Sequence, residues 1–317
     1  MPREDRPSES RVRENRSHGI DEGELETGLC LGTVAPAEAR PDNAGLPVTA
    51  PVPYSTADYV KNYYFNTPTP DYIVFWGRYF LFGTSDTFDA STEPAALKNA
   101  GIDYVFPIAT PKQTRLSTGG TTGYNDGYSD GQTVCTNIAN AVGNNSLSPG
   151  VHWPSNYALY VWLDVETSTL LHYKYWAGWH DGVRASYTYV PSLHEDIHLF
   201  YPCAYCNPVN GQGDIDGTIV NVCKVLTYDS SYKANGIWSS EPEPGTCDPY
   251  CYSPGPSSFE TSAVCPDLAT FLWQYSEEDQ CTSCPNDCCG GDCPFPDVDL
   301  DMSNPAHTVV SNMLTVS

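Results

Sequence analysis

The chain has 317 residues, a net charge of −24 and 40% hydrophobic residues, including 22 Tyr and 7 Trp. This apolar content is enough for a core and excludes a disordered protein. The sequence contains no run of about 18 apolar residues, so we expect no membrane-spanning helix. The acidic balance argues against nucleic acids and anionic membrane surfaces as partners.

Residues 1–44 are polar and charged, with five Arg among the first sixteen positions. We expect an N-terminal tail that is flexible or ordered only against an assembly partner. The folded part is expected to span residues 45–317 as one domain. No apolar stretch of the kind that a secretory signal needs occurs in residues 1–28. Three explanations are therefore open. The protein is exported by another route, its true first residue lies after Met1, or it leaves the cell inside a larger particle.

Apolar runs and amphipathic stretches alternate from residue 72 onward, which predicts strands and helices in turn. The predicted strands and helices, in chain order, are a strand at 72–82, a helix at 91–101, a strand at 102–110, a helix at 131–143, a strand at 158–163, a helix at 172–187, and strands at 196–201, 234–238, 270–275 and 297–300. In the first helix, Thr92 is the expected N-cap, Pro94 lies in the first turn and Gly101 ends the helix. Residues 213–217, GDIDG, predict a turn rather than a calcium loop.

The order strand, helix, strand, with nearly continuous apolar strands, is typical of a parallel sheet covered by helices. Most of the predicted strands end in polar residues, namely Thr110, Asp164, Glu166, Tyr201, Ser239, Gln274 and Asp299. Polar groups at the carboxyl ends of strands build the sites of α/β barrels. We therefore predict a (β/α) barrel of the TIM type, flattened or irregular. A doubly wound open sheet is the alternative, weakened by the lack of a Gly-rich phosphate loop.

Two carboxylates, Asp164 and Glu166, follow the apolar run that precedes them. Residues two apart in a strand point to the same face, so these side chains are expected to point the same way. Such a pair at a barrel mouth suits glycosidic cleavage, in which one acid protonates the leaving oxygen and a second group supports the developing cation. The alternative is structural: Asp164 caps a helix and Glu166 forms a salt bridge.

Thirteen Cys are present, and eight of them lie in residues 247–293. We predict a disulfide-rich C-terminal insert, and hence an extracellular or particle-associated protein. Zinc or an iron–sulfur cluster is the weaker interpretation of this insert, because no His lies nearby. We therefore expect no metal and no cofactor. Cys30 is the cysteine expected to be free or paired elsewhere.

Five stretches in order resemble the family 25 lysozymes and their glycoside-hydrolase-like relatives. They are YVWLDVE, HLFYPCAY, GIWSS, FLWQYS and DVDLDMSNP, and the resemblance covers residues 45–305. It implies a flattened (β/α) barrel that cleaves peptidoglycan or a related amino-sugar glycan. By this resemblance Glu166 matches the general acid and Asp164 the supporting carboxylate. The positions that match substrate-binding residues are Tyr201, Trp238, Trp273 and Asp299.

The sequence also departs from that family. Its first strand normally supplies an Asp, and the best placement, residues 45–51, has Pro47 there, whose side chain can neither accept a proton nor form a hydrogen bond. Asp301 stands where the family usually has Asn. The alternative function is therefore a catalytically inactive barrel that serves as a carbohydrate-binding or structural component of an extracellular assembly.

Overall fold

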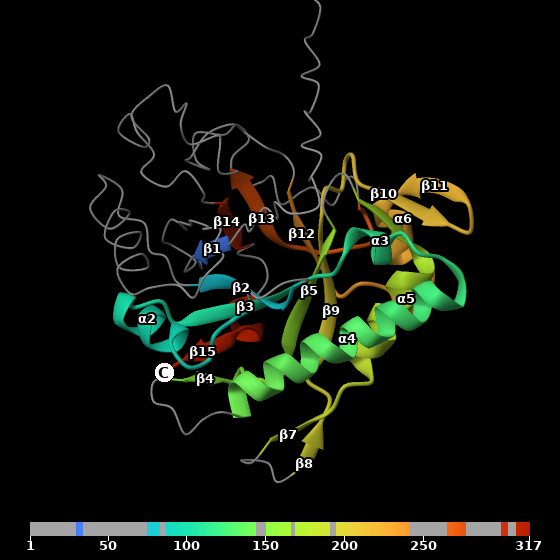
Figure 1. The fold of residues 1–317 in the computed structure, drawn as a ribbon. Coiled ribbons are helices and arrows are strands. Elements are labelled where there is room, and N and C mark those ends of the chain that lie inside the picture. The colour runs from blue at the N-terminus through green and yellow to red at the C-terminus, as the bar shows by residue number, and fades with distance from the viewer. Residues whose placement is uncertain are drawn as a thin grey trace, which may run out of the picture.

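The computed structural model describes residues 30–33, 75–82, 87–143, 150–165, 169–190, 195–240, 265–276, 299–303 and 309–317. In these residues the chain forms a mixed α/β fold around one large curled sheet (Figure 1). Pro47, Glu166 and most of the predicted Cys-rich insert lie outside the described residues.

In the described residues the large sheet has ten strands, of which eight form a series whose two ends also pair with each other, while β15 (Leu314–Val316) and β4 (Val151–His152) extend the sheet at one end of that series. Its main strands are β1 (Cys30–Thr33), β2 (Phe75–Phe82), β3 (Tyr104–Thr110), β5 (Leu159–Val165), β9 (Phe200–Cys206), β12 (Ile237–Ser239), β13 (Thr270–Ser276) and β14 (Asp299–Ser303). They are ordered β2-β1-β14-β13-β12-β9-β5-β3, and β2 also pairs with β3. The predicted α/β class is therefore confirmed, with a barrel-like sheet.

The strand directions differ from those of a regular eight-stranded parallel barrel. Strands β2, β3, β5, β9, β12 and β13 are parallel to their neighbours in that series. Strand β14 runs antiparallel to β13, and β1 runs antiparallel to β2. β1 itself comes from the segment predicted to be a tail. The pairings thus establish a curled, barrel-like sheet but not a TIM barrel.

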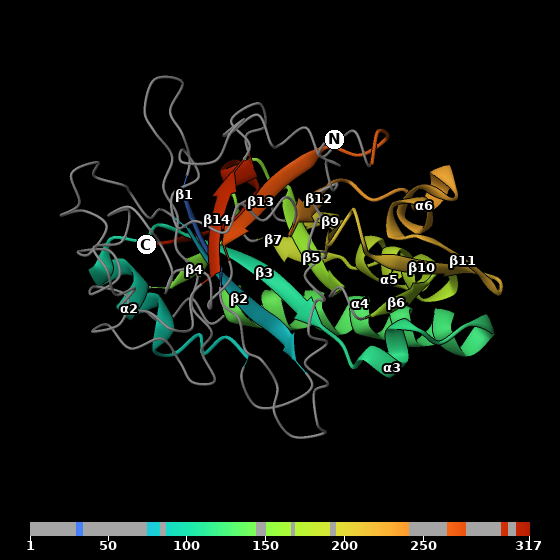
Figure 2. The ribbon, with the colours of Figure 1, turned by 90° about the horizontal axis from the view of Figure 1, so that it is seen from above.

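Short strands and helices complete the described structure. The short strands are β4 (Val151–His152), β6 (Leu170–His172), β7 (Thr188–Val190), β8 (Glu195–Ile197), β10 (Gln212–Ile215), β11 (Thr218–Asn221) and β15 (Leu314–Val316). The α-helices are α2 (Glu93–Ala100), α3 (Gln113–Leu116), α4 (Gly120–Gly143), α5 (Tyr173–Arg184) and α6 (Val222–Thr227), and η1 (Ser230–Tyr232) and η5 (Val309–Asn312) are 3-10 helices. In both views α4 and α5 lie on one side of the sheet, away from β13 and β14 (Figures 1 and 2).

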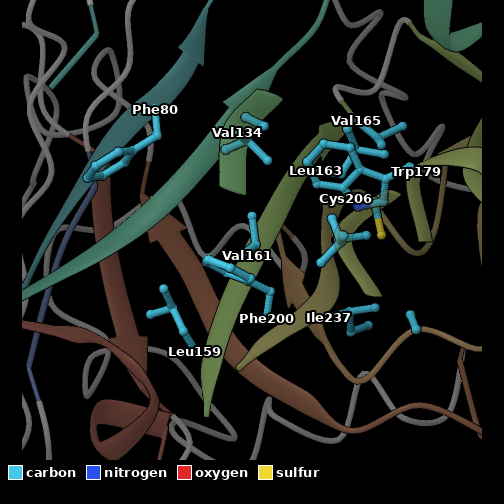
Figure 3. Packing of buried hydrophobic residues seen from close by; sticks show 14 of the residues in the cluster. Phe80, Val134, Leu159, Val161, Leu163, Val165, Trp179, Phe200, Cys206 and Ile237 are labelled. Atoms are coloured by element: carbon cyan, nitrogen blue, oxygen red, sulfur yellow. The ribbon is translucent and has the colours of Figure 1, made fainter. Parts of the chain in front are cut away.

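The buried side chains form two clusters, one on each face of the sheet. The outer cluster joins the sheet to α4, α5 and α6, and the inner cluster fills the space that the curled sheet encloses. Strand β5 contributes to both, because successive side chains of a strand point to opposite faces. Leu159, Val161, Leu163 and Val165 belong to the outer cluster (Figure 3), and Trp162 belongs to the inner one.

Helices α4 and α5 approach so closely that glycines of each helix contact the backbone of the other. A Cβ on Gly127 would overlap the carbonyl oxygen of Tyr175, and one on Gly178 would overlap that of Tyr124. Gly131 and Gly182 are crowded in the same way. Helix α4 begins eleven residues before the predicted start at 131, because this backbone contact outweighs the low helix propensity of its glycines.

Helix α2 (Glu93–Ala100) lies within the predicted range of 91–101 but has a different N-terminal arrangement. The Thr92 hydroxyl donates to Asp89 (2.8 Å) and does not cap the helix, whereas Gly101 ends it in the left-handed conformation, with φ 71°. Glu93 accepts two hydrogen bonds from Arg78 of β2, at 2.5 and 2.6 Å, and both side chains are fully buried. This pair joins α2 to the outer face of β2.

The remaining differences from prediction concern short elements. The strand predicted at 196–201 is two strands, the end of hairpin β7–β8 and the start of β9. Of the predicted turn at 213–217, residues 213–215 belong to β10 and residues 216–217 form the turn to β11, in which Asp216 and Gly217 have φ 51° and 90°. These positive φ values are those of a two-residue hairpin turn.

Candidate functional site

The inner face of the sheet carries Asp164 at the carboxyl end of β5. Because Leu163 and Val165 point toward the helices, Asp164 points with Trp162 to the enclosed side. Asp164 is only 6% exposed. A largely buried carboxyl group needs partners or a function, since burial disfavours its charged form.

Asp164 has one partner and one unpaired oxygen. The Thr110 hydroxyl, at the carboxyl end of β3, donates to Asp164 Oδ2 at 2.7 Å. Asp164 Oδ1 is buried and has no hydrogen-bond partner among the described residues. Burial raises the pKa of Asp164 to about 6, and the hydrogen bond from Thr110 opposes part of that rise. The group can therefore change its protonation state in the pH range where general acid–base chemistry operates.

Aromatic and amide side chains of β9, β12 and β13 lie beside Asp164 on the same edge of the sheet. Tyr205 of β9 is the cross-strand neighbour of Asp164, and Trp238 of β12 is the neighbour of Tyr205. The rings of Tyr205 and Trp238 are 4.2 Å apart between centroids. The Tyr205 hydroxyl donates to Gln274 Oε1 of β13 at 2.6 Å. Together these contacts hold Tyr205 beside the carboxyl group of Asp164.

Ser240 lies one residue beyond β12, at the same edge. Its backbone N–H donates to the Cys206 carbonyl oxygen at 3.2 Å, which continues the pairing of β12 with β9. The alternation of the strand therefore places Ser240 on the inner face with Trp238. Ser240 is 3% exposed, and its Oγ has no hydrogen-bond partner among the described residues.

The structure separates the residues that the sequence predicted for the site. Tyr201 pairs in register with Tyr160, four residues before Tyr205, and so lies about 13 Å along the strand from the level of Asp164. The guanidinium of Arg184 lies over its ring at 4.9 Å. Tyr201 is thus at the amino edge, and it is Tyr205 that lies beside Asp164.

The other predicted binding residues occupy three different surroundings. Trp238 is in the inner cluster and contacts Tyr205, whereas Trp273 is fully buried in the outer cluster. Asp299 begins β14, whose next residue, Leu300, pairs with Ser276 at the carboxyl end of β13. Its backbone therefore lies at the same edge as Asp164. Glu166 follows β5 by one residue and is outside the described residues.

Two residues of this edge were not identified from the sequence. Tyr205 is on the same strand as Tyr201, and Ser240 directly follows Ser239. From the sequence, Tyr201 and Ser239 are predicted as strand-end polar residues, whereas Tyr205 and Ser240 are not. Their assignment depends on which residues alternate onto the inner face, and this in turn depends on the register of β9 and β12. The sequence signal was the HLFYPCAY stretch itself, which contains two tyrosines four residues apart.

His172 has a structural role, and the described residues contain no cluster suited to a metal ion. His172 Nδ1 accepts from the Lys174 backbone N–H at 3.0 Å and so caps α5. His180 is largely buried, and this burial lowers its pKa to about 4. No cluster of three or more His, Cys, Asp or Glu side chains suited to a metal occurs in the described ranges. In the same ranges no helix is long and apolar enough to cross a membrane.

A hollow of about 340 Å³ lies elsewhere, on the outer side of β2. Phe80, Phe88, Asp89 and Asn137 are among the residues that line it. Phe80 belongs to the outer cluster, so the hollow does not open onto Asp164. We assign no function to it.

Comparison with known proteins does not identify a family. No protein-family model matches the chain, and no curated protein matches it. A similar solved structure is the 1.07 Å crystal structure of an uncharacterized B. stearothermophilus protein, with 17% sequence identity, a TM-score of 0.46, and coverage of 81% of this chain and 94% of that chain. A likeness at this level carries no argument about function.

Proposed function

We propose that the protein is a glycoside hydrolase-like barrel that acts on peptidoglycan or a related amino-sugar glycan. The observation that carries the proposal is the state of Asp164, which is buried on the inner face, hydrogen-bonded through one oxygen to Thr110, and raised in pKa to about 6. Carboxyl groups with environments of this kind perform acid–base and cation-stabilising roles in glycosidases. The sequence adds Glu166 two residues later.

In this mechanism Glu166 protonates the glycosidic oxygen as the bond to the leaving sugar breaks. Asp164, above its pKa, supports the positive charge that develops on the sugar ring or its amide substituent. Thr110 donates to Asp164 Oδ2 and leaves Oδ1 buried without a hydrogen-bond partner among the described residues. Tyr205 and Trp238 supply aromatic surface beside the carboxyl group. The finer fold proposed here is the flattened barrel of the family 25 lysozymes.

The second candidate function is a non-catalytic module that binds glycan or has a structural role in an extracellular or particle-borne assembly, with the N-terminal segment contacting a partner. Pro47 favours it from the sequence. The packing also favours it, because Trp162 and Trp238 are buried within the inner cluster instead of being exposed for sugar stacking. The bridge between Cys223 and Cys265 is weakly consistent with an extracellular location under either function.

The decisive experiment is glycan release from purified peptidoglycan and from chitin oligomers. We expect release by the wild type and loss of at least about 100-fold in rate for Glu166→Gln, as is typical when a general acid is removed. Asp103→Asn is the control, because the side chain of Asp103 is 57% exposed and forms an ion pair with Lys98 at the surface.

Release that is equal in Glu166→Gln and wild type would refute the assigned role of Glu166. A correctly folded wild type that releases nothing from either substrate would refute the hydrolase and leave the binding module.

A further inference from the structure

Six buried polar side-chain atoms lack a hydrogen-bond partner among the described residues, and two of them lie at the same edge of the sheet, on its inner face. They are Trp76 Nε1, Arg78 Nη1, Asp164 Oδ1, Trp179 Nε1, His180 Nδ1 and Ser240 Oγ. Trp76 and Trp179 belong to the outer cluster, Arg78 reaches Glu93 on α2, and His180 is on α5. Only Asp164 and Ser240 lie on the inner face at the carboxyl edge.

Buried polar atoms are nearly always hydrogen-bonded, and leaving one unpaired is unfavourable because its hydrogen bonds to water are lost without replacement. Two such atoms on one face of one sheet edge therefore indicate that something else supplies their partners. From this geometry we propose that Ser240 is a specificity-determining residue of the candidate site, and that its hydroxyl binds a neutral sugar unit whose other side donates to Asp164 Oδ1. This inference rests on the proposed function for its glycan class.

The distance between the two residues suits a single sugar unit. Strand β9 separates β5 from β12, and neighbouring strands lie about 4.8 Å apart, so β5 and β12 are about 10 Å apart. Trp238 is the residue of β12 level with Asp164, and Ser240 lies two residues, or about 7 Å, further along, so the backbones of Asp164 and Ser240 are about 12 Å apart. Both side chains point inward and shorten this gap. Tyr205 lies between them, and its hydroxyl already donates to Gln274.

The chemistry of the two atoms restricts the ligand. A carboxylate oxygen only accepts hydrogen bonds, so the group that meets Asp164 Oδ1 must be an N–H or O–H donor. A hydroxyl both donates and accepts, so Ser240 can meet a ring substituent oxygen or an amide carbonyl. A negatively charged group beside Asp164 would be repelled. Neutral sugars with hydroxyl or acylamino groups fit these requirements, and sugar acids do not.

The test compares binding of chitin oligomers, as neutral amino sugars, and polygalacturonate oligomers, as sugar acids, by calorimetry. We expect the wild type to bind the chitin oligomers in preference, and Ser240→Ala to bind them about 3- to 10-fold more weakly, the value of one neutral hydrogen bond. The melting temperature of Ser240→Ala should equal or exceed that of the wild type, because a buried hydroxyl without a partner is removed. Ser117→Ala, at an exposed serine at the end of α3, is the control and should change neither quantity.

The outcomes separate this inference from the proposed hydrolase. Weaker binding by Ser240→Ala with no cleavage by the wild type would support the role of Ser240 and refute the hydrolase. Equal binding by Ser240→Ala and wild type, or a lower melting temperature of the variant, would refute the role of Ser240 alone. No binding of chitin oligomers by the folded wild type, or preference for polygalacturonate, would refute both the inference and its glycan class.

Discussion

The ionised form of Asp164 is stabilised by one hydrogen bond, from Thr110, and destabilised by burial. The pKa of Asp164, about 6, lies above the ordinary value of 3.8 because burial outweighs the bond from Thr110. The unfolded chain ionises this group more readily than the folded chain does. The unfavourable contribution is therefore absent at pH values below about 4, grows as the pH rises to about 6, and is complete above it.

We predict that Asp164→Asn stabilises the protein at neutral and alkaline pH. Asn can still accept from Thr110 but does not ionise, so the free energy of unfolding should rise by about 2–3 kcal/mol at pH 8 and by little at pH 4. Urea unfolding at the two pH values measures the difference. The exposed Asp103→Asn should show no comparable gain. A loss of stability in Asp164→Asn at pH 8 would mean that the carboxylate is held in its charged form.

At the scale of elements, the contact of α4 with α5 depends on glycines at every fourth position. The carbonyl oxygens that a Cβ would meet belong to backbone, which cannot move aside as a side chain can. The two helices therefore have one close arrangement, stabilised by many dispersion contacts. Helix α5 in turn packs against β9, and its Trp179 and Val183 are buried in the outer cluster.

We predict that Gly178→Ala lowers the free energy of unfolding by about 3 kcal/mol or more, since even one added methyl group must push the helices apart. Gly143→Ala is the matched control on α4, because nothing lies within 4 Å of its Cβ position. Its effect should be within about 0.5 kcal/mol or favourable. Chemical denaturation of both variants checks this. Similar small effects for the two substitutions would show that the helices separate at low cost.

At the scale of the whole molecule, a disulfide ties α6 to the segment before β13. Cys223 and Cys265 are 42 residues apart in sequence and both are buried. The bridge restricts the unfolded chain across the long connection between β12 and β13. The described residues also include three buried cysteines that form no disulfide, Cys135, Cys203 and Cys206.

We predict that replacing both bridge cysteines, as Cys223→Ala with Cys265→Ala, lowers the free energy of unfolding by about 2–4 kcal/mol. The double variant avoids leaving a single reactive thiol, and urea unfolding without reductant measures the change. A loss below about 1 kcal/mol would indicate that packing alone holds Cys265 and Leu268 in the core.

Local patterns determined a large part of the fold. The apolar runs that became β2, β3, β5, β12 and β13 were identified because hydrophobicity is a property of neighbouring residues, and Gly101 marked the end of α2 because only its own backbone angle is required. The i, i+2 spacing likewise placed Asp164 on one face of a strand. These inferences need no knowledge of what lies across the sheet.

The tertiary structure alone decided what depends on distant residues. The sequence does not indicate that Gly127 and Gly131 of α4 lie against α5, since glycine has a low helix propensity and argues against a helix there. It also does not indicate that Cys30–Thr33 pairs with β14. The same holds for the site, where Thr110 meets Asp164 and Tyr205 replaces Tyr201 beside it. The physical reason is that strand register and helix contact are set by the packing of segments far apart in the chain, whereas periodicity records only which residues prefer to be buried.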